Sequence, residues 1–71
     1  MSEEVIAEMV ANVWKVLVSE GDGVDEGETI CILESMKMEI PVEAPSSGTV
    51  SSVKVAEGET VQEGDVIAVI E

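Results

Sequence analysis

The chain contains the same unit twice. Shifting the 71-residue sequence by 37 positions places residues 1–34 on residues 38–71. Between residues 13 and 34, ten of the twenty-two aligned pairs are identical. Two similar halves that fold together pack most simply about a pseudo-twofold axis. Three residues, Ser35-Met36-Lys37, join the copies, so we predict that they lie at one end of the molecule. Met1 and Glu71 should then lie together at the other end.

Each copy has the pattern of short strands separated by glycine turns. Thirteen Val and six Ile, with no Phe and no Tyr, favour pleated surfaces over helix. The expected strands cover residues 5–8, 13–18, 29–34, 39–44, 49–56 and 66–70, with Val24 and Val61 as single apolar residues between turns. The run 29–34 is apolar on both faces, as in a central strand. Pro41 cannot donate a backbone hydrogen bond, which indicates an edge strand or a bulge. The sequence therefore predicts an all-β fold of two small antiparallel sheets packed face to face, or a flattened barrel.

The charged and nucleophilic residues exclude most enzyme classes. The net charge of −13 disfavours binding to nucleic acid. The acidity serves solubility, or complements a basic face on a partner enzyme. The chain has no His, so the usual general base is missing, and Cys31 alone provides neither a disulfide nor a zinc ligand set. The acidic turns lack the spacing of a calcium loop. We expect no catalytic residue, no metal, and a protein that is not an enzyme by itself.

The length of the chain indicates how many domains it forms, and its first residues indicate where in the cell it is expected. Seventy-one residues make one small domain, which we place at residues 1–71, built from the repeats 1–34 and 38–71. We see neither a signal peptide nor a membrane-spanning segment. A single unpaired cysteine suits a reducing compartment. We therefore expect a cytoplasmic protein.

The junction between the copies holds the one motif that suggests chemistry. Two strand-like runs flank Met36-Lys37 without spare residues, so the turn must be a tight hairpin. A lysine at its tip would hold its amine far from the core, between two flexible methionines. From the residues alone, an ordinary surface lysine with methionines that fill gaps in the core is equally acceptable.

This junction resembles the attachment motif of biotinyl carrier domains. The resemblance rests on Glu34-Ser35-Met36-Lys37-Met38-Glu39, on residues 44–50 that follow it, and on the Gly-rich pattern at 21–27 with its copy at 58–64. It covers nearly the whole chain and is closest to stand-alone bacterial biotin attachment proteins. It implies a barrel-sandwich hybrid of two four-stranded antiparallel sheets with quasi-twofold symmetry and the lysine on the exposed turn.

The resemblance also implies a function. Biotin protein ligase would attach biotin to Lys37, with Met36 and Met38 as recognition flanks and Glu34 and Glu39 as possible ligase contacts. The biotin would carry carboxyl groups from a biotin carboxylase to a carboxyltransferase of an acyl-CoA or related carboxylase, so the chemistry belongs to the cofactor and the partners. The inserted thumb of some acetyl-CoA carboxylase carriers is absent.

Two other functions and two other residues stay open. Lipoyl carriers share this fold, although their lysine commonly follows an acidic residue, whereas Met36 precedes Lys37 here. An unmodified acidic interaction module is the third alternative. Trp14 is expected to pack in the core beside Val16, or else to face a partner or the biotin. Cys31 is expected to be a small buried residue, because the second copy has Ala68 at its place.

Overall fold

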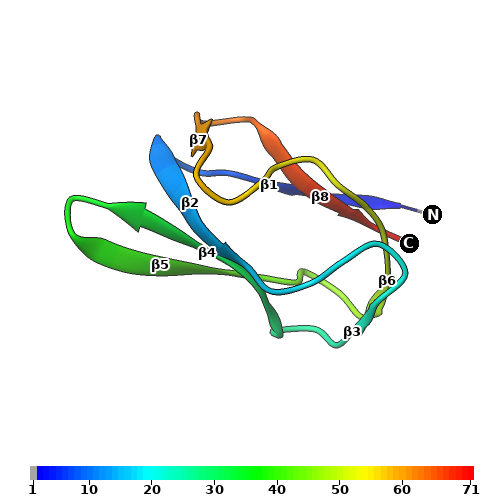
Figure 1. Ribbon diagram of the computed structural model, residues 1–71. Coiled ribbons are helices and arrows are strands. Elements are labelled where there is room, and N and C mark those ends of the chain that lie inside the picture. The colour runs from blue at the N-terminus through cyan, green and yellow to red at the C-terminus, as the bar shows by residue number, and fades with distance from the viewer. Residues whose placement is uncertain (1) are drawn as a thin grey trace.

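In the computed structural model, which describes residues 2–71, the chain forms strands without helices (Figure 1). The strands are β1 (Glu3–Ile6), β2 (Ala11–Val16), β3 (Gly23–Val24), β4 (Thr29–Ser35), β5 (Met38–Glu43), β6 (Gly48–Val53), β7 (Thr60–Val61) and β8 (Val66–Ile70). The all-β prediction is confirmed, and most boundaries differ from the expected ones by one to three residues. No helix that could span a membrane is found among residues 2–71.

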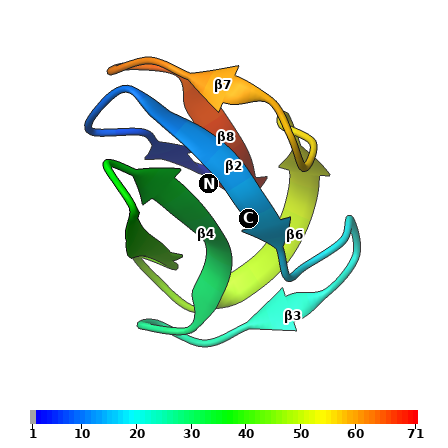
Figure 2. The same ribbon diagram turned by 60° about the vertical axis from the view of Figure 1, so that its left-hand side comes forward.

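The strands form two four-stranded antiparallel sheets that face each other (Figure 2). Their strand orders are β1-β8-β6-β3 and β5-β4-β2-β7. The 37-residue shift converts β1–β4 into β5–β8, and the same exchange converts one sheet order into the other. Each sheet therefore contains two strands from each copy. The predicted quasi-twofold arrangement of two sheets is confirmed.

Backbone hydrogen bonds outside the strands follow the same symmetry. The bond from Ala7 N–H to Asp65 O is equivalent to the bond from Ala44 N–H to Glu28 O. The bond from Gly21 N–H to Val50 O is equivalent to the bond from Gly58 N–H to Val13 O, and each of the four is 2.8 Å long. All four of these bonds join the two copies. The backbone of neither copy is thus satisfied by its own residues alone.

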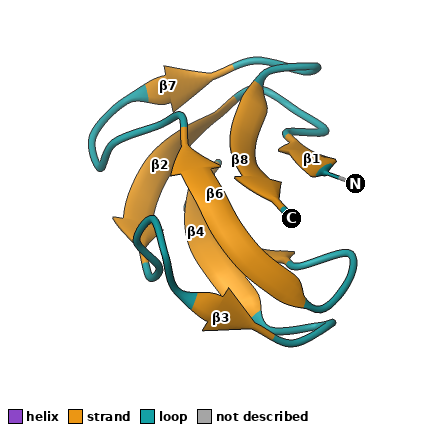
Figure 3. Ribbon diagram, turned by 90° about the vertical axis from the view of Figure 1, so that its right-hand side faces the viewer, coloured by secondary structure: helices purple, strands orange, loops and turns teal. Residues whose placement is uncertain are grey.

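The core lies between the two sheets, whose strands Figure 3 shows, and both copies contribute buried apolar side chains to it. The largest fully buried side chains are Ile30, Leu33, Ile67, Ile70, Val13, Val50, Val61 and Cys31. Six of these eight form three equivalent pairs under the shift: Ile30 with Ile67, Leu33 with Ile70, and Val13 with Val50. Val24 and Val61, which come from the two shortest strands, are buried as expected. Small aliphatic side chains thus close the interior without an aromatic residue.

Gly48 is required by packing. A Cβ atom at Gly48 would overlap the backbone oxygen of Glu71 and lie 2.9 Å from Cγ2 of Ile70. Its equivalent in the first copy, Ala11, begins β2 and is buried, so that place does hold a Cβ. Both residues start strands, but at Gly48 the backbone of Glu71 and the side chain of Ile70 leave no room for a Cβ.

The expected burial of Trp14 is wrong. The pairing of β2 with β4 shifts between Val13 and Lys15. Trp14, between them, is the extra residue of a β-bulge and has no partner residue on β4. A bulge changes which side of the sheet the following side chains face. Val13 is buried, whereas Trp14 and Lys15 are both exposed. Trp14 is 44% exposed, and the Lys15 amine lies 5.7 Å from the centre of its ring.

The long axis separates two poles. The molecule measures 33 × 18 × 17 Å. β5 is an edge strand, as Pro41 predicted, and β4 lies between β5 and β2. The β4–β5 hairpin projects at one end, and the described chain ends lie together at the other (Figure 1). Glu3 pairs with Ile70 at that second pole. Met1, for which we made the same expectation, lies outside the described residues.

Candidate functional site

The hairpin turn consists of two residues. β4 ends at Ser35 and β5 begins at Met38, and these two residues are paired. Met36 and Lys37 form the turn between them, with φ angles of 53° and 65°. Two consecutive positive φ values are typical of the type I′ turn, whose twist matches that of the flanking strands. The turn is therefore the geometry that a two-residue hairpin favours.

The residues in this turn are not those that the geometry favours. Type I′ turns prefer Asn-Gly or Asp-Gly, because most side chains clash with the backbone at positive φ. Met36 and Lys37 are the only non-glycine residues with positive φ among residues 2–71. Such strain concentrates at functional sites, where the surrounding structure holds it. The side chains of this turn are thus kept for a reason other than turn stability.

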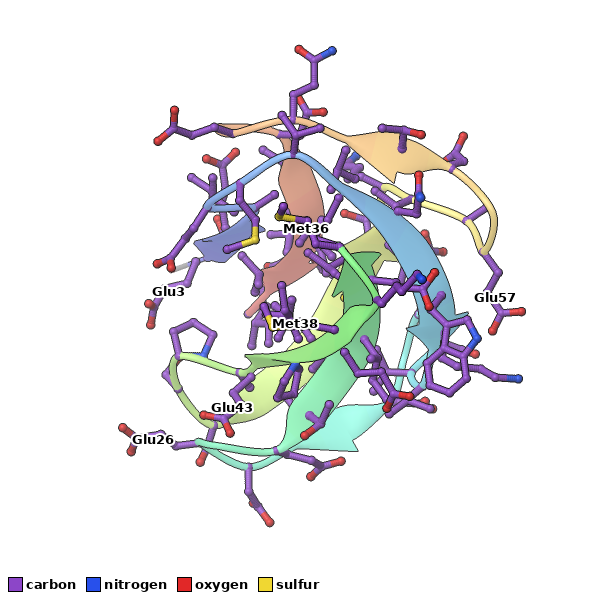
Figure 4. All side chains as sticks on the ribbon, turned by 90° about the vertical axis from the view of Figure 1, so that its left-hand side faces the viewer. Glu3, Glu26, Met36, Met38, Glu43 and Glu57 are labelled. Carbon is purple, nitrogen blue, oxygen red and sulfur yellow. The ribbon has the colours of Figure 1, made fainter. Side chains whose placement is uncertain are left out.

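Both turn residues are exposed. Lys37 and Met38 are exposed, and Met36 is 89% exposed. The interpretation that these methionines fill gaps in the core is wrong. Figure 4 looks onto this end of the molecule, where Met36 and Met38, the neighbours of Lys37 in the sequence, lie near the centre of the view. This position allows acylation of the amine without rearrangement of the fold.

Two carboxylates flank the turn. Glu34 and Glu39 pair directly across β4 and β5, one step inward from Ser35 and Met38. Both side chains are exposed. Like charges directly opposite each other destabilise a sheet. The hairpin therefore carries a second unfavourable feature beside its turn, and a basic partner surface would relieve it.

A cleft opens beside the hairpin, between the edge strands β1 and β5. Its volume is about 580 Å³. Its apolar lining comes from Val5, Ile6, Ala7, Met9, Leu33, Ile40, Pro41, Val42 and Pro45, with Glu4, Glu8 and Glu43 as its charged residues. We did not predict this cleft from the sequence. The signal lay in the repeat, because Ile6 and Met9 stand where the second copy has Glu43 and Ser46.

The remaining candidate groups do not form a reactive centre. Burial raises the pKa of the Cys31 thiol from its ordinary value of 9.0 to about 11, because desolvation disfavours the thiolate. A protonated, buried thiol is a poor nucleophile at neutral pH. Cys31 is thus the small buried residue that we expected. Residues 2–71 contain no group of three His, Cys, Asp or Glu side chains that could hold a metal ion.

Comparisons with known sequences agree on one family. Residues 2–70 match a family model described as "Biotin-requiring enzyme". The chain is 57% identical over 53 residues to a biotinylated protein TB7.3 homolog of Mycobacterium leprae, which covers 75% of each chain. It is 52% identical over 46 residues to the biotin/lipoyl attachment protein of Bacillus subtilis, covering 65% of this chain and 63% of that protein.

Comparisons with solved structures give the same fold within much larger enzymes. The chain superimposes on part of the urea carboxylase of Kluyveromyces lactis with a TM-score of 0.93 and 35% identity. It superimposes on part of a single-chain, multi-domain long-chain acyl-CoA carboxylase with a TM-score of 0.89 and 29% identity. The match covers 100% and 96% of this chain, but only 6% and 7% of those chains.

Proposed function

Because this chain belongs to the family of biotin-requiring enzymes, we propose that it is a biotin carboxyl carrier with Lys37 as its attachment residue. The observation that carries the proposal is the position of Lys37. It is exposed at the tip of a strained two-residue turn, at the pole opposite the paired strand ends Glu3 and Ile70. The turn thus presents Lys37 with its side chain exposed at the surface.

The residues around Lys37 fit attachment of biotin by a ligase. Ligation forms an amide between the lysine Nζ and the biotin carboxyl group, which the ligase first activates as an adenylate. An exposed tip lets Nζ enter the active site of another enzyme. We propose Met36 and Met38 as recognition flanks, and Glu34 and Glu39 as contacts for the ligase. Bound biotin supplies the carboxyl-carrying chemistry, and this chain supplies position and reach.

The proposed partners follow from the relatives. Similar domains occur within urea carboxylase and acyl-CoA carboxylase chains. We propose that this carrier meets a biotin carboxylase and a carboxyltransferase in turn, as one domain of residues 1–71 in the cytoplasm. Its two poles suit this role, because a subunit or linker held near β1 and β8 would leave the hairpin facing outward.

A lipoyl carrier is the second candidate, and one observation favours it. The Bacillus subtilis relative carries both biotin and lipoyl in its name. In this chain Met36 precedes the lysine, which favours biotin. The intact mass of the protein purified from its native host distinguishes the two groups, and an unchanged mass indicates an unmodified interaction module.

The Lys37→Ala variant tests the attachment residue. We expect it to lose all capture by streptavidin after incubation with biotin, ATP and a bacterial biotin protein ligase, because the acceptor amine is gone. Its free energy of unfolding should change by less than about 0.5 kcal/mol, since an exposed side chain at a turn makes few contacts.

Lys15→Ala and Lys54→Ala are the matched controls. They remove the other two lysines, which are also exposed, and both should be captured as well as the parent chain. Biotin on the Lys37→Ala variant, detected by intact mass, would place the attachment residue elsewhere.

A further inference from the structure

The repeat provides an internal comparison for every exposed residue. Ile6, Met9 and Val10 are 45%, 41% and 62% exposed. The equivalent residues of the second copy are Glu43, Ser46 and Ser47, which occupy the same places in the same fold. Since the fold accepts polar side chains at these places, the apolar side chains of the first copy are not needed for folding. An exposed apolar cluster without a folding role indicates an interaction surface.

These three residues lie beside the hairpin. Ile6 and Met9 line the cleft together with Leu33 of β4 and Ile40 of β5. Val10 directly precedes β2, where Asn12 pairs with Glu34 next to the turn. We define the apolar patch as Ile6, Met9, Val10, Met36 and Met38. The equivalent polar loop of the second copy, residues 44–47, is on the other half of the symmetric structure, where it has no such hairpin beside it.

Acidic side chains surround the apolar patch. Glu4, Glu8 and Glu43 belong to the cleft, and Glu34 and Glu39 flank the turn. In the view onto the hairpin, Met36 and Met38 lie near the centre, and Glu43 of the cleft lies to the lower left of Met38 (Figure 4). A second copy of a chain with a net charge of −13 would be repelled from this surface. The fitting occupant is a protein surface with an apolar centre and a basic rim.

We propose that the apolar patch is the docking surface for the biotin protein ligase, and that Ile6, Met9 and Val10 extend ligase recognition beyond the hairpin. This inference rests on the proposed function. Before modification the reacting amine lies only one lysine side chain from the backbone, so the ligase must approach the pole itself. A carboxylase acts at the end of the longer biotinylated side chain and can work from farther away. Contacts next to the turn therefore serve the ligase most directly.

The double variant M9S/V10S tests the proposal, because it installs the serines that the second copy carries at these places. With a bacterial biotin protein ligase, biotin and ATP, we expect the KM for the carrier to rise about tenfold, as the loss of a central interface contact would cause. kcat should stay close to that of the parent chain, since Lys37 and its turn are unchanged. Adding salt should raise the KM of the parent chain, because the rim of the surface is charged.

Leu17→Ser is the matched control. Leu17 is also an exposed apolar residue of the first copy, but it follows the end of β2 that is remote from the turn. Its KM should equal that of the parent chain. If the double variant unfolds, the single variant V10S replaces it in the test, because Val10 is the most exposed of the three residues. The KM of the ligase for the V10S carrier should still rise severalfold.

The outcomes separate the docking proposal from the proposed function. An unmodified parent chain would refute the carrier function. A fully biotinylated parent chain, together with a folded M9S/V10S variant of unchanged KM, would refute docking on the apolar patch and leave the carrier function intact.

Discussion

At the scale of single residues, the turn combines predicted and unpredicted features. A tight turn followed from the absence of spare residues between two strand patterns, and the exposure of Lys37 followed from the turn. The positive φ angles of Met36 and Lys37 did not follow, because neither residue type signals a left-handed conformation. The resemblance pointed to Lys37, Met36 and Met38, but it did not indicate that the backbone of Met36 and Lys37 adopts a conformation that these residue types disfavour.

Replacing Lys37 by Gly should stabilise the protein. Glycine adopts positive φ without a Cβ clash, and the gain exceeds the added freedom of the unfolded chain. We expect the free energy of unfolding to rise by about 1 kcal/mol, which corresponds to an increase in Tm of about 5 °C for a domain of this size. Thermal unfolding followed by circular dichroism measures this directly. The Lys37→Ala variant is the control, because it removes the amine and keeps the strained Cβ; equal Tm values for the two variants would mean that the turn stores no strain.

At the scale of elements, β2 shows the limit of reasoning from alternation. The pattern around Trp14 predicted a regular strand with Trp14 beside Val16 on the buried face. One bulge between Val13 and Lys15 moves the tryptophan to the surface. A bulge depends on the pairing partner, here β4, and the local sequence carries no clear signal for it. In contrast, the edge position of β5 was predictable, because Pro41 lacks the donor that an inner strand needs.

The β4–β5 hairpin should gain stability when its like charges are removed. Glu34 and Glu39 lie directly opposite each other, so Glu39→Lys replaces a repulsion by an attraction. We expect the free energy of unfolding to rise by about 0.5 kcal/mol at low salt, with the gain fading as salt screens the pair. Urea unfolding at two salt concentrations measures it. The same variant should be biotinylated more slowly if Glu39 contacts the ligase, and unchanged ligation kinetics would remove Glu39 from the proposed contacts.

At the scale of the whole molecule, the 37-residue repeat predicted the symmetry and the placement of the junction. It could not predict how the halves interlock. Sequence similarity between two halves is equally compatible with two separate small sheets, one from each copy. The structure instead builds each sheet from two strands of each copy. Buried pairs such as Ile30 with Ile67 then meet in one shared core, which a half of this size could not form alone.

Each half should therefore be unfolded by itself. We expect peptides 1–37 and 38–71 to lack cooperative thermal unfolding when separate, because each would expose its share of the core. Mixed in equal amounts, they should associate and recover the strand signal in circular dichroism. Both halves are acidic, so association should strengthen as salt screens their repulsion. Cooperative unfolding of either peptide alone would contradict the interlocked arrangement.

The pairing of β1 with β8 also determines how the domain responds to force. These strands are antiparallel, and Glu3 lies beside Ile70, so the two ends of the described chain lie at the same pole. Tension applied through the ends would load the hydrogen bonds of this pair one after another, in the manner of a zipper opened from its end. The β4–β5 hairpin lies outside the path of that force. A pull through these ends would therefore separate β1 from β8 first, and Lys37, at the opposite pole, would be displaced last.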